Sequence, residues 1–409
     1  MPSRLPVQRD AQAGNPPKLL TAPFVLIVAS GLAYFLGLAM LNPVLPVYVD
    51  GPLRGNGVQV GIGVGSFALG AVLLRPFAGR IGDRVGRRVL LLGGAFIVAV
   101  ATSLYGVVEA LWWLSSVRFV AGIGEAAFFV GAATMIADLA PESRRGEAMS
   151  YWSVAVYGGL AFGPFLGEIV LGSQDHEHFV RAWMVSAALA LLAVAVGWFT
   201  REAESFQASQ TLVKAPLLHR NAIGPGLVLF LGLVALAGWA TFVKLYARDE
   251  LGLAQARTVF LVYGAVILLI RVIGARLPDL LGPKVACTGA LILGIAGMTM
   301  IALWVTAAGL YLGTVVFAIG MSLMYPALLV MALDGVPANE RGSVIGTVSS
   351  FFDLSQGVGA AICGAFKGLF GYSAVFWAGA GLAGVGLVVL YSLPTSRQVS
   401  GRLPGLVEQ

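Results

Sequence analysis

Long runs of apolar residues, separated by short polar segments, follow one another from residue 21 to residue 394. A helix that crosses a bilayer needs about 20 mostly apolar residues, and runs of this length recur along the chain. The pattern predicts twelve spanning helices, over 21–49, 57–79, 88–108, 112–137, 146–171, 178–200, 222–246, 255–276, 284–306, 309–334, 342–366 and 372–394. The expected fold class is therefore all-α integral membrane.

The longest polar segment between spans, residues 201–221, divides the predicted helices into two groups of six. The first twenty residues contain prolines and charges but no continuous apolar stretch, so they do not resemble a signal peptide. The predicted organisation is an N-terminal tail (1–20), a six-helix bundle (21–200), a linker (201–221), a second six-helix bundle (222–394) and a C-terminal tail (395–409).

The composition agrees with a membrane protein. The chain has 409 residues, of which 58% are hydrophobic and 11% are charged, whereas soluble proteins carry about 25% charged residues. The net charge of +6 is not accompanied by a basic patch interleaved with aromatic residues, so the lipid bilayer, and not nucleic acid, is the expected partner. No metal site is expected, because the run from Asp175 to His178 supplies only adjacent residues in a loop.

The basic residues predict the orientation of the chain. Cytoplasmic loops carry an excess of lysine and arginine. If the N-terminus is cytoplasmic, most of the 26 basic residues lie at cytoplasmic ends, and Arg118 lies within a span. Only six basic residues lie at or near the outer side, namely Arg54, Arg181, Lys244, Arg248, Arg257 and Lys367. We therefore expect a multi-pass protein of the cell membrane (the inner membrane) with both termini in the cytoplasm.

The two halves are repeats with a constant offset of 196 residues. The matched pairs are Arg75 with Arg271, Asp83 with Asp279, Gly86 with Gly282, Arg88 with Lys284, Asp138 with Asp334, Pro141 with Pro337 and Arg145-Gly146 with Arg341-Gly342. Parallel repeats of six spans are a transporter architecture with a binding site between the halves near the bilayer midplane. A monomer suffices for such a site, because the repeats bury their own interface.

Three motifs resemble signatures of the major facilitator superfamily, and in particular of its twelve-span drug/proton antiporters. The segment Gly79–Arg88 resembles the signature between spans two and three, and Arg118–Gly124 resembles that of span four. Gly159, Gly163, Pro164 and Gly167 resemble the span-five motif of antiporters, although Ser150 stands where the longer form has another glycine. The resemblance implies two pseudo-symmetric bundles that alternate access by a rocker-switch motion.

The resemblance also implies a conformational latch at the cytoplasmic side. Asp83 is expected to accept hydrogen bonds from the amide end of span eleven near Gly342, where a carboxylate is stabilised by the free amides and the dipole. Arg84 or Arg87 is expected to pair with Asp138. The other members of the latch are Gly79, Gly86 and Arg88. The alternative is that these arginines only set the topology.

Three charged residues within the predicted spans are the candidates for proton coupling. Arg118 and Glu125 are seven residues apart in span four, which places them on one face at a separation of about 10 Å. Asp353 lies near the middle of span eleven. Charges at this depth are costly, face the protein interior and usually mark a substrate or proton path. The alternative for Arg118 and Glu125 is a static buried ion pair.

Several uncharged residues are expected to form the substrate cavity between the halves. They are Asn42, Phe129, Tyr157, Trp239, Tyr325 and Gln356, although most membrane aromatics are packing residues or interface anchors. The span-five glycines, four residues apart, permit close helix contact. The resemblance implies that this contact is made with the other half; the alternative is ordinary close packing.

The sequence thus predicts a proton-coupled antiporter that exports a small amphipathic organic compound, with the proton gradient as its energy source and no cofactor. A transporter of lysolipid or lipid-like compounds, similar to spinster-type proteins, and a sugar or nutrient symporter are the alternatives. An enzyme is not expected, since no nucleophile and base lie within reach near a membrane face. ATP drive is not expected either, because no phosphate-binding loop occurs in the sequence.

Overall fold

The computed structural model describes residues 19–141, 144–172, 176–201, 218–253, 255–273, 282–337 and 340–393. The regular elements in these ranges are all helices: α1 (Ala22–Ala39), α2 (Val44–Asp50), α3 (Gly57–Val85), α4 (Arg87–Leu104), the 3-10 helix η1 (Tyr105–Val107), α5 (Leu111–Leu139), α6 (Arg145–Leu171), α7 (His176–Trp198), α8 (Arg220–Asp249), α9 (Arg257–Ile273), α11 (Pro283–Leu303), α12 (Ala307–Leu333), α13 (Arg341–Phe370) and α14 (Tyr372–Ser392).

The helices confirm the predicted all-α membrane fold. With α1 and α2 taken as one interrupted span, each long helix in the described ranges covers one predicted span. Ten of these spans are long and apolar enough to cross a membrane by length and composition alone. The two others are α9, which has 17 residues, and α13, which carries Asp353 and Gln356.

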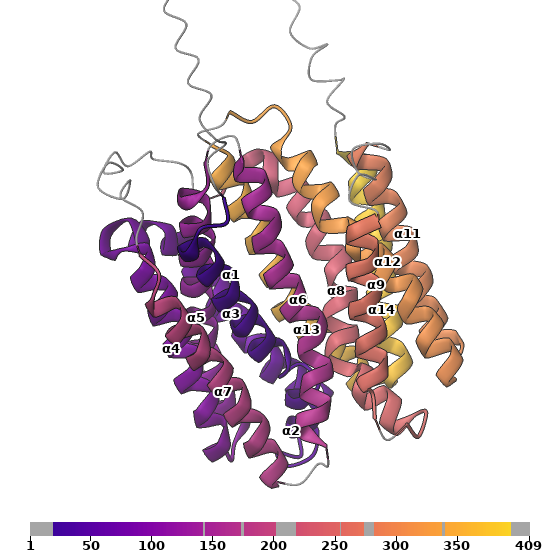
Figure 1. Cartoon of the computed structure of the whole chain (residues 1–409). Helices are drawn as coiled ribbons and strands as arrows, with labels where there is room; N and C mark the ends of the chain where they lie inside the picture. Colours follow the sequence, from indigo (N-terminus) through magenta and orange to yellow (C-terminus); the bar gives the residue numbers. More distant parts are fainter. Residues whose placement is uncertain are drawn as a thin grey trace, which may run out of the picture.

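The helices pack as two bundles that meet along two seams. Helices α1 to α7 contact one another, as do α8 to α14, and the main contacts between the bundles are α3 with α13 and α6 with α9. In Figure 1 the indigo-to-magenta bundle lies beside the orange-to-yellow bundle, with α6 and α13 near the junction. We call the side where α1 begins and α14 ends the termini face, and the side where α2 ends the opposite face.

The first span is broken between α1 and α2. A turn over Met40–Pro43 separates the two helices, and Pro43 occupies the N-cap of α2. Proline has no amide hydrogen to donate and is readily accommodated at the start of a helix. The break leaves Asn42 exposed between buried neighbours, so it positions one polar side chain at the edge of the space between the bundles.

The 196-residue repeat is also present in the backbone. Gly86 directly precedes α4 with a φ of 104°, and its repeat partner Gly282 directly precedes α11 with a φ of 83°. A positive φ in this range costs glycine little but disfavours residues with a Cβ. The two matched glycines therefore mark the same sharp corner between the second and third helices of each bundle.

At the opposite face, α3 and α13 approach closely through small residues. A Cβ on Gly57, Gly61 or Gly65 would collide with backbone atoms of α13, chiefly the carbonyl oxygens of Gly364, Ala360 and Gly357. Small residues at four-residue spacing are typical of such helix contacts in membranes. This seam closes the space between the bundles at the opposite face.

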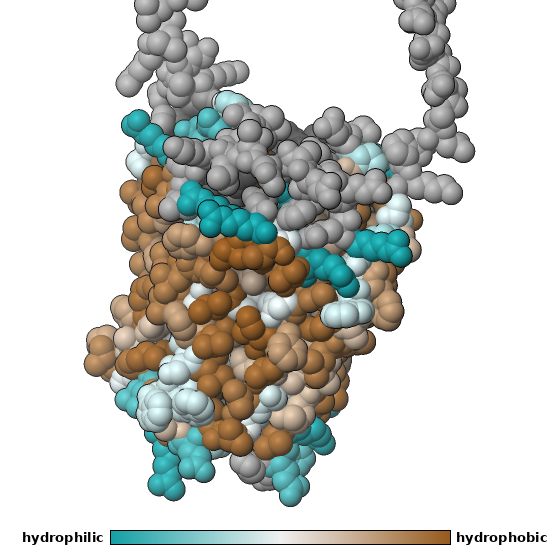
Figure 2. Space-filling model, turned by 90° about the vertical axis from the view of Figure 1, so that its left-hand side faces the viewer, coloured by the Kyte–Doolittle hydropathy of each residue, from teal (hydrophilic) through white to brown (hydrophobic). Residues whose placement is uncertain are grey.

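The surface carries an apolar belt. Figure 2 shows a broad hydrophobic band around the middle of one side of the molecule, with hydrophilic residues at both ends. Large apolar side chains are exposed on the outward surfaces of the helices, among them Phe96, Val100, Leu191 and Leu192. Such an extensive apolar surface requires a hydrocarbon environment, as expected of a membrane protein.

The seam predicts a specific disulfide cross-link. A Cβ placed on Gly368 lies 3.9 Å from Val58 Cγ2, so side chains at these two positions are in van der Waals contact across the seam. In a background with Cys287 and Cys363 replaced by alanine, the pair V58C and G368C should form a disulfide under mild oxidation. After the chain is cleaved between the two bundles, the cross-linked halves should then run together on a non-reducing gel. The pair V58C and L369C is the control, because Leu369 is 75% exposed. Equal cross-linking of both pairs contradicts the seam.

Candidate functional site

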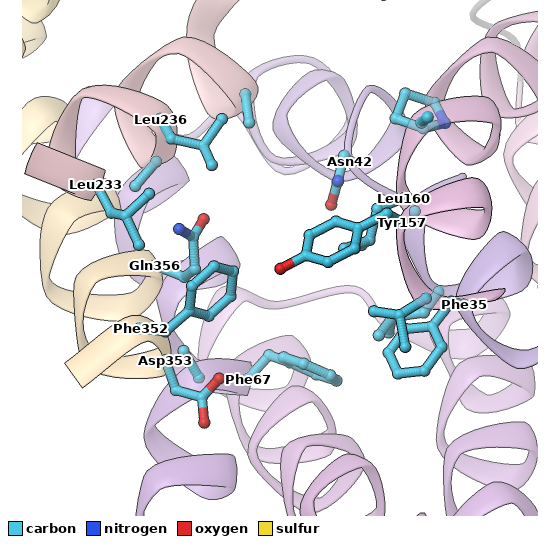
Figure 3. A pocket seen from close by; sticks show the side chains of 18 of the residues that line it. Phe35, Asn42, Phe67, Tyr157, Leu160, Leu233, Leu236, Phe352, Asp353 and Gln356 are labelled. Carbon is cyan, nitrogen blue, oxygen red and sulfur yellow. The ribbon is translucent and has the colours of Figure 1, made fainter. Parts of the chain in front are cut away.

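A cavity of about 290 Å³ lies between the two bundles. Helices of both bundles form its wall, and Figure 3 shows side chains from the two sides facing one another across it. Most of the wall is apolar or aromatic, with the rings of Phe35, Phe67, Phe129, Tyr157, Trp239, Phe260, Tyr263, Tyr325 and Phe352. Concave apolar sites with a few placed polar groups are the usual form of small-molecule sites.

Arg75 joins two carboxylates at the wall of this cavity. Its Nη2 atom donates hydrogen bonds to both carboxylate oxygens of Glu125, at 3.1 and 3.0 Å. Its Nε atom lies 2.7 Å from Asp353 Oδ2, in a close ion contact that is poorly aligned for a hydrogen bond. Glu125 belongs to the same bundle as Arg75, whereas Asp353 belongs to the other. The Arg75–Asp353 contact therefore crosses the interface.

The Arg75 cluster is almost fully removed from solvent. The side chains of Arg75 and Glu125 are each 7% exposed, and that of Asp353 is 11% exposed. The guanidinium carbon of Arg75 also lies 4.8 Å from the centroid of the Phe129 ring. Buried charges persist only when they are paired and hydrogen-bonded. Here one cation faces two anions, so the cluster has a formal charge of −1 when both acids are ionised.

Arg118 has a different environment from the one its spacing suggested. Its Nε and Nη2 atoms donate to the backbone carbonyls of Gly63 and Val64, at 3.2 and 2.8 Å, and its guanidinium carbon lies 4.8 Å from the Phe67 ring centroid. The alternative of an Arg118–Glu125 ion pair is wrong, because Arg75 takes the glutamate. Arg118 lines the cavity, but its contacts bind α5 to α3 within one bundle.

All six predicted cavity residues line the cavity; their contact with a substrate remains a prediction. In Figure 3 the Tyr157 hydroxyl points across the cavity toward Gln356 and Phe352 of α13, and Asn42 lies at its edge. The indole of Trp239 stacks on Tyr263 with centroids 4.4 Å apart and donates to Thr314 at 3.3 Å. The remaining two of the six are Phe129, stacked under Arg75, and Tyr325, 3.4 Å from Ser349 Oγ.

The repeat produces a second contact of an arginine across the interface. The guanidinium carbon of Arg271 in α9 lies 3.4 Å from the centroid of the Tyr157 ring in α6. Arg271 is the repeat partner of Arg75, and Tyr157 is the repeat partner of Asp353, both at an offset of 196 residues. The two contacts are thus related by the pseudo-symmetry, but one arginine meets a carboxylate and the other meets a tyrosine.

Charged pairs also join the two bundles near the opposite face. Lys244 of α8 forms an ion pair with Glu168 of α6, and both side chains are buried. The second carboxylate oxygen of Glu168 accepts from the Ala256 amide at 3.1 Å. Asp50 pairs with Arg248 at 2.7 Å and lies 3.9 Å from Lys367. Opening this face requires all these contacts to separate.

The predicted latch residues lie at the termini face, where the structure describes only some of their side chains. Arg87 pairs with Asp138 within the first bundle. Arg88 donates to the Trp198 carbonyl at 2.6 Å, and Arg84 is exposed. Gly79 and Gly86 lie in the described backbone. Asp83 was expected to contact the first turn of α13 near Gly342. The side chain of Asp83 and the surroundings of Gly342 are not among the features that the structure describes, so this contact stays a prediction.

The span-five glycines contact a different partner from the expected one. Gly159, Gly163 and Gly167 face α1, where an added Cβ would meet Phe35, Ala39 and Met40 respectively. Pro164 lines the cavity. The expectation that the glycine stripe touches the other half is wrong, because its close contact lies within the first bundle. Contact with the other bundle is made elsewhere on α6, by Ala161 against Gly264 and by Glu168.

Three functional candidates were missed by the sequence analysis. Arg75 enters the sequence analysis only as the repeat partner of Arg271, although it lies well inside α3. Arg75 and Arg271 are repeat partners, and each lies in an apolar run. Two arginines at matched positions within predicted spans are the signal that could have identified both as functional candidates. Glu168 was missed although it is an acid within the span-five motif region, one residue after Gly167.

Comparison with known proteins agrees with this architecture. The family model described as Major Facilitator Superfamily matches residues 27–360 and 284–408. An uncharacterized MFS-type transporter of Salmonella typhimurium is 28% identical over 364 residues, which cover 85% of this chain and 90% of the relative. A crystallised nucleoside transporter superposes with a TM-score of 0.74 at 13% identity, covering 91% of this chain and 99% of that one. A bacterial homologue of the human lysosomal transporter Spinster, inward-facing and occupied, gives 0.75 at 15% identity, covering 93% and 96%.

The Arg75 cluster predicts a strong and non-additive effect on stability. The variant R75Q leaves two buried carboxylates without their cation and should lower the free energy of unfolding by about 3–5 kcal/mol. Adding D353N to R75Q should recover part of this loss, because one uncompensated charge is removed. Thermal unfolding in detergent measures both effects, with R257Q as the control at an exposed arginine. Strictly additive losses in the double variant argue against the cluster.

Proposed function

The chain belongs to the major facilitator superfamily, and from this premise we propose that it is a secondary active transporter that exchanges protons for a small amphipathic organic compound. The relatives reported above are transporters by name, and the solved structures share the fold. The finer assignment of coupling and substrate is our proposal and is argued from the cavity.

The observation that carries the proposal is the sharing of Arg75 between Glu125 and Asp353. One arginine cannot neutralise two carboxylates, so the cluster has room for one additional positive charge. A proton or a cationic group of the substrate can supply it, and the two then compete for the same carboxylates. Burial disfavours the charged carboxylate and a nearby cation favours it. A movement that changes the Arg75–Asp353 distance therefore changes the proton affinity.

The contacts between the bundles support alternating access. The α3–α13 seam and the pairs of Glu168 with Lys244 and Asp50 with Arg248 hold the opposite face closed in this structure. We propose that these contacts separate in the other state and that Asp83 then contacts the other bundle and closes the termini face, with Arg84 and the Arg87–Asp138 pair of the first bundle beside it. The Arg75–Asp353 contact lies between these two regions, where both movements affect it.

The cavity supports a small substrate. Its volume of about 290 Å³ is at the lower end of the range for small-molecule sites, and its aromatic wall suits an apolar body. A lipid-like compound would have to leave its chain outside this cavity, and the mainly apolar and aromatic wall favours a compound with an apolar body over a sugar. The flux experiment below therefore includes a lysolipid and a sugar as alternative substrates.

The location and energy source are also proposed. The distribution of basic residues favours a cell-membrane protein with both termini in the cytoplasm, so that the termini face is cytoplasmic. The proton gradient then supplies the energy, and the Glu125–Arg75–Asp353 cluster binds the proton without any cofactor. We also propose that the protein acts as a monomer, because described residues from both bundles of one chain line the cavity.

The proposal predicts that the two carboxylates are required for coupling. In liposomes subjected to a pH jump, E125Q or D353N should abolish substrate flux driven by the proton gradient, because the exchangeable proton site is lost. Both variants should still insert into the membrane. E109Q is the matched control, since Glu109 is exposed and outside the cavity, and it should transport like the parent protein. Lysolipids, sugars and amphipathic aromatic compounds are the substrates to compare.

Full gradient-driven activity in both E125Q and D353N contradicts the proposed coupling. Accumulation of a sugar with protons, in place of exchange, supports the symport alternative. Preferential flux of a lysolipid supports the lipid alternative.

A further inference from the structure

Arg271 is a cation in the cavity wall that lacks an anionic partner among the described residues. It lines the cavity and its guanidinium covers the ring of Tyr157. Its Nε atom is buried and finds no hydrogen-bond partner in the part of the chain that the structure describes. None of the ion pairs formed among the described residues includes Arg271, whereas Arg75 has two carboxylates. A face of a tyrosine ring attracts a cation only weakly compared with a carboxylate.

The pseudo-symmetry shows what Arg271 lacks. Arg75 reaches across the interface to Asp353, and Arg271 reaches across the same interface to Tyr157, which occupies the repeat position of Asp353. The second acid of the Arg75 cluster is also missing, because the repeat partner of Glu125 is Met321. Arg271 thus keeps the position of Arg75 in the other bundle, but the acids that neutralise Arg75 are replaced by an aromatic and an apolar residue.

The charges of the wall are therefore separated into two regions. Arg75, Glu125 and Asp353 together carry a formal charge of −1, and Arg271 carries +1 on the other side of the pseudo-symmetry axis. Arg118, the remaining cation of the wall, is held by the carbonyls of Gly63 and Val64. Two of its nitrogens already donate to these carbonyls, whereas none of the hydrogen bonds or ion pairs formed among the described residues engages Arg271.

We propose that Arg271 binds an anionic group of the transported compound, such as a carboxylate, sulfonate or phosphate. The guanidinium presents its planar fork to such groups and remains charged at all physiological pH values. The neighbouring rings of Tyr157, Tyr263 and Trp239 line the same cavity and hold the apolar body. The inference rests on the proposed function only in taking this cavity as the transport site.

Exchange against protons adds a condition on the rest of the substrate. A bound anion without a positive group would favour protonation of the nearby carboxylates, so the anion and the proton would be transported in the same direction. A compound that exchanges with protons must also carry a positive group that competes with the proton at Glu125 and Asp353. The two charged regions of the wall together fit a zwitterionic amphipathic compound, with its anionic group at Arg271.

A matched set of naphthyl probes tests the assignment by ligand-induced thermal shift of the purified protein. The set consists of naphthylacetate, neutral naphthylacetamide and cationic naphthylethylamine, with naphthylalanine as the zwitterion and dodecyl phosphate as a lipid-like phosphate. The carboxylate-bearing probes should stabilise the protein more than the amide. In R271Q their affinity should fall about tenfold or more, the effect of losing a charge-assisted hydrogen bond. The amide affinity should change little.

Two further variants separate binding from structural damage. Y157D gives Arg271 the acid that its repeat partner has, so it should remove the preference for carboxylate probes while leaving Arg271 in place. R257Q makes the same substitution as R271Q at an exposed arginine of the same helix, and it should keep the preference. Size-exclusion chromatography and helical circular dichroism show which variants are folded. If R271Q does not fold, Y157D and R271K decide the question.

Each outcome bears on the assignment. Preference for the amide or the amine, an equal response to all probes, no response to any, or an unchanged preference in R271Q or Y157D contradicts it. A dodecyl phosphate response that exceeds that of the naphthyl carboxylates assigns the anionic group to a lipid-like compound. If the amine exchanges with protons but no anion binds, the inference fails and the proposed function stands. If anions bind through Arg271 but no flux follows the pH gradient, the proposed function fails and the anion site stands.

Discussion

The contact on which the structure most depends is that of one buried arginine with carboxylates from both bundles. Arg75 binds Glu125 of its own bundle and Asp353 of the other, and all three side chains are nearly excluded from solvent. Taking these charges out of water is costly, so they persist only in mutual contact. Any rotation of one bundle against the other therefore changes the energy of this cluster directly. The protonation and pairing of these three side chains are therefore coupled to the position of one bundle relative to the other.

The remaining features of the interface act around this cluster. Small residues let α3 and α13 meet at the opposite face, and the Glu168–Lys244 pair joins α6 to α8 in the same region. The glycines of α6 tie it to α1, so that α6 moves with its own bundle. The repeat supplies a second arginine at the interface without a second set of acids. A nearly symmetric scaffold has thus acquired an asymmetric distribution of charge.

The spans and the intramembrane acids could be predicted from the sequence because the bilayer imposes strict conditions. Its thickness fixes the length of each apolar run, and the cost of a charge in hydrocarbon singled out Glu125 and Asp353 before any contact was known. All six predicted cavity residues line the cavity. The repeat offset also correctly paired Gly86 with Gly282, which share an unusual backbone conformation.

The partners of these residues could not be predicted, because they depend on packing between distant segments. Spacing along one helix suggested that Arg118 faces Glu125, but Arg75 on the adjacent helix binds this acid instead. A glycine stripe predicts that a helix comes close, but it does not identify which helix, and here α1 takes the place expected for the other bundle. Arg75 was overlooked since it adjoins a basic loop whose arginines are explained by topology alone.

The central claim, that two carboxylates sharing Arg75 form the exchangeable proton site, is tested most directly by infrared difference spectroscopy of the reconstituted protein during a pH step. Protonation of a buried carboxylate produces a carbonyl stretching band of the neutral acid. The account predicts such a band in the parent protein and in E109Q, and its loss in D353N or E125Q. Absence of the band in the parent protein, or its persistence in both cluster variants, would contradict the account.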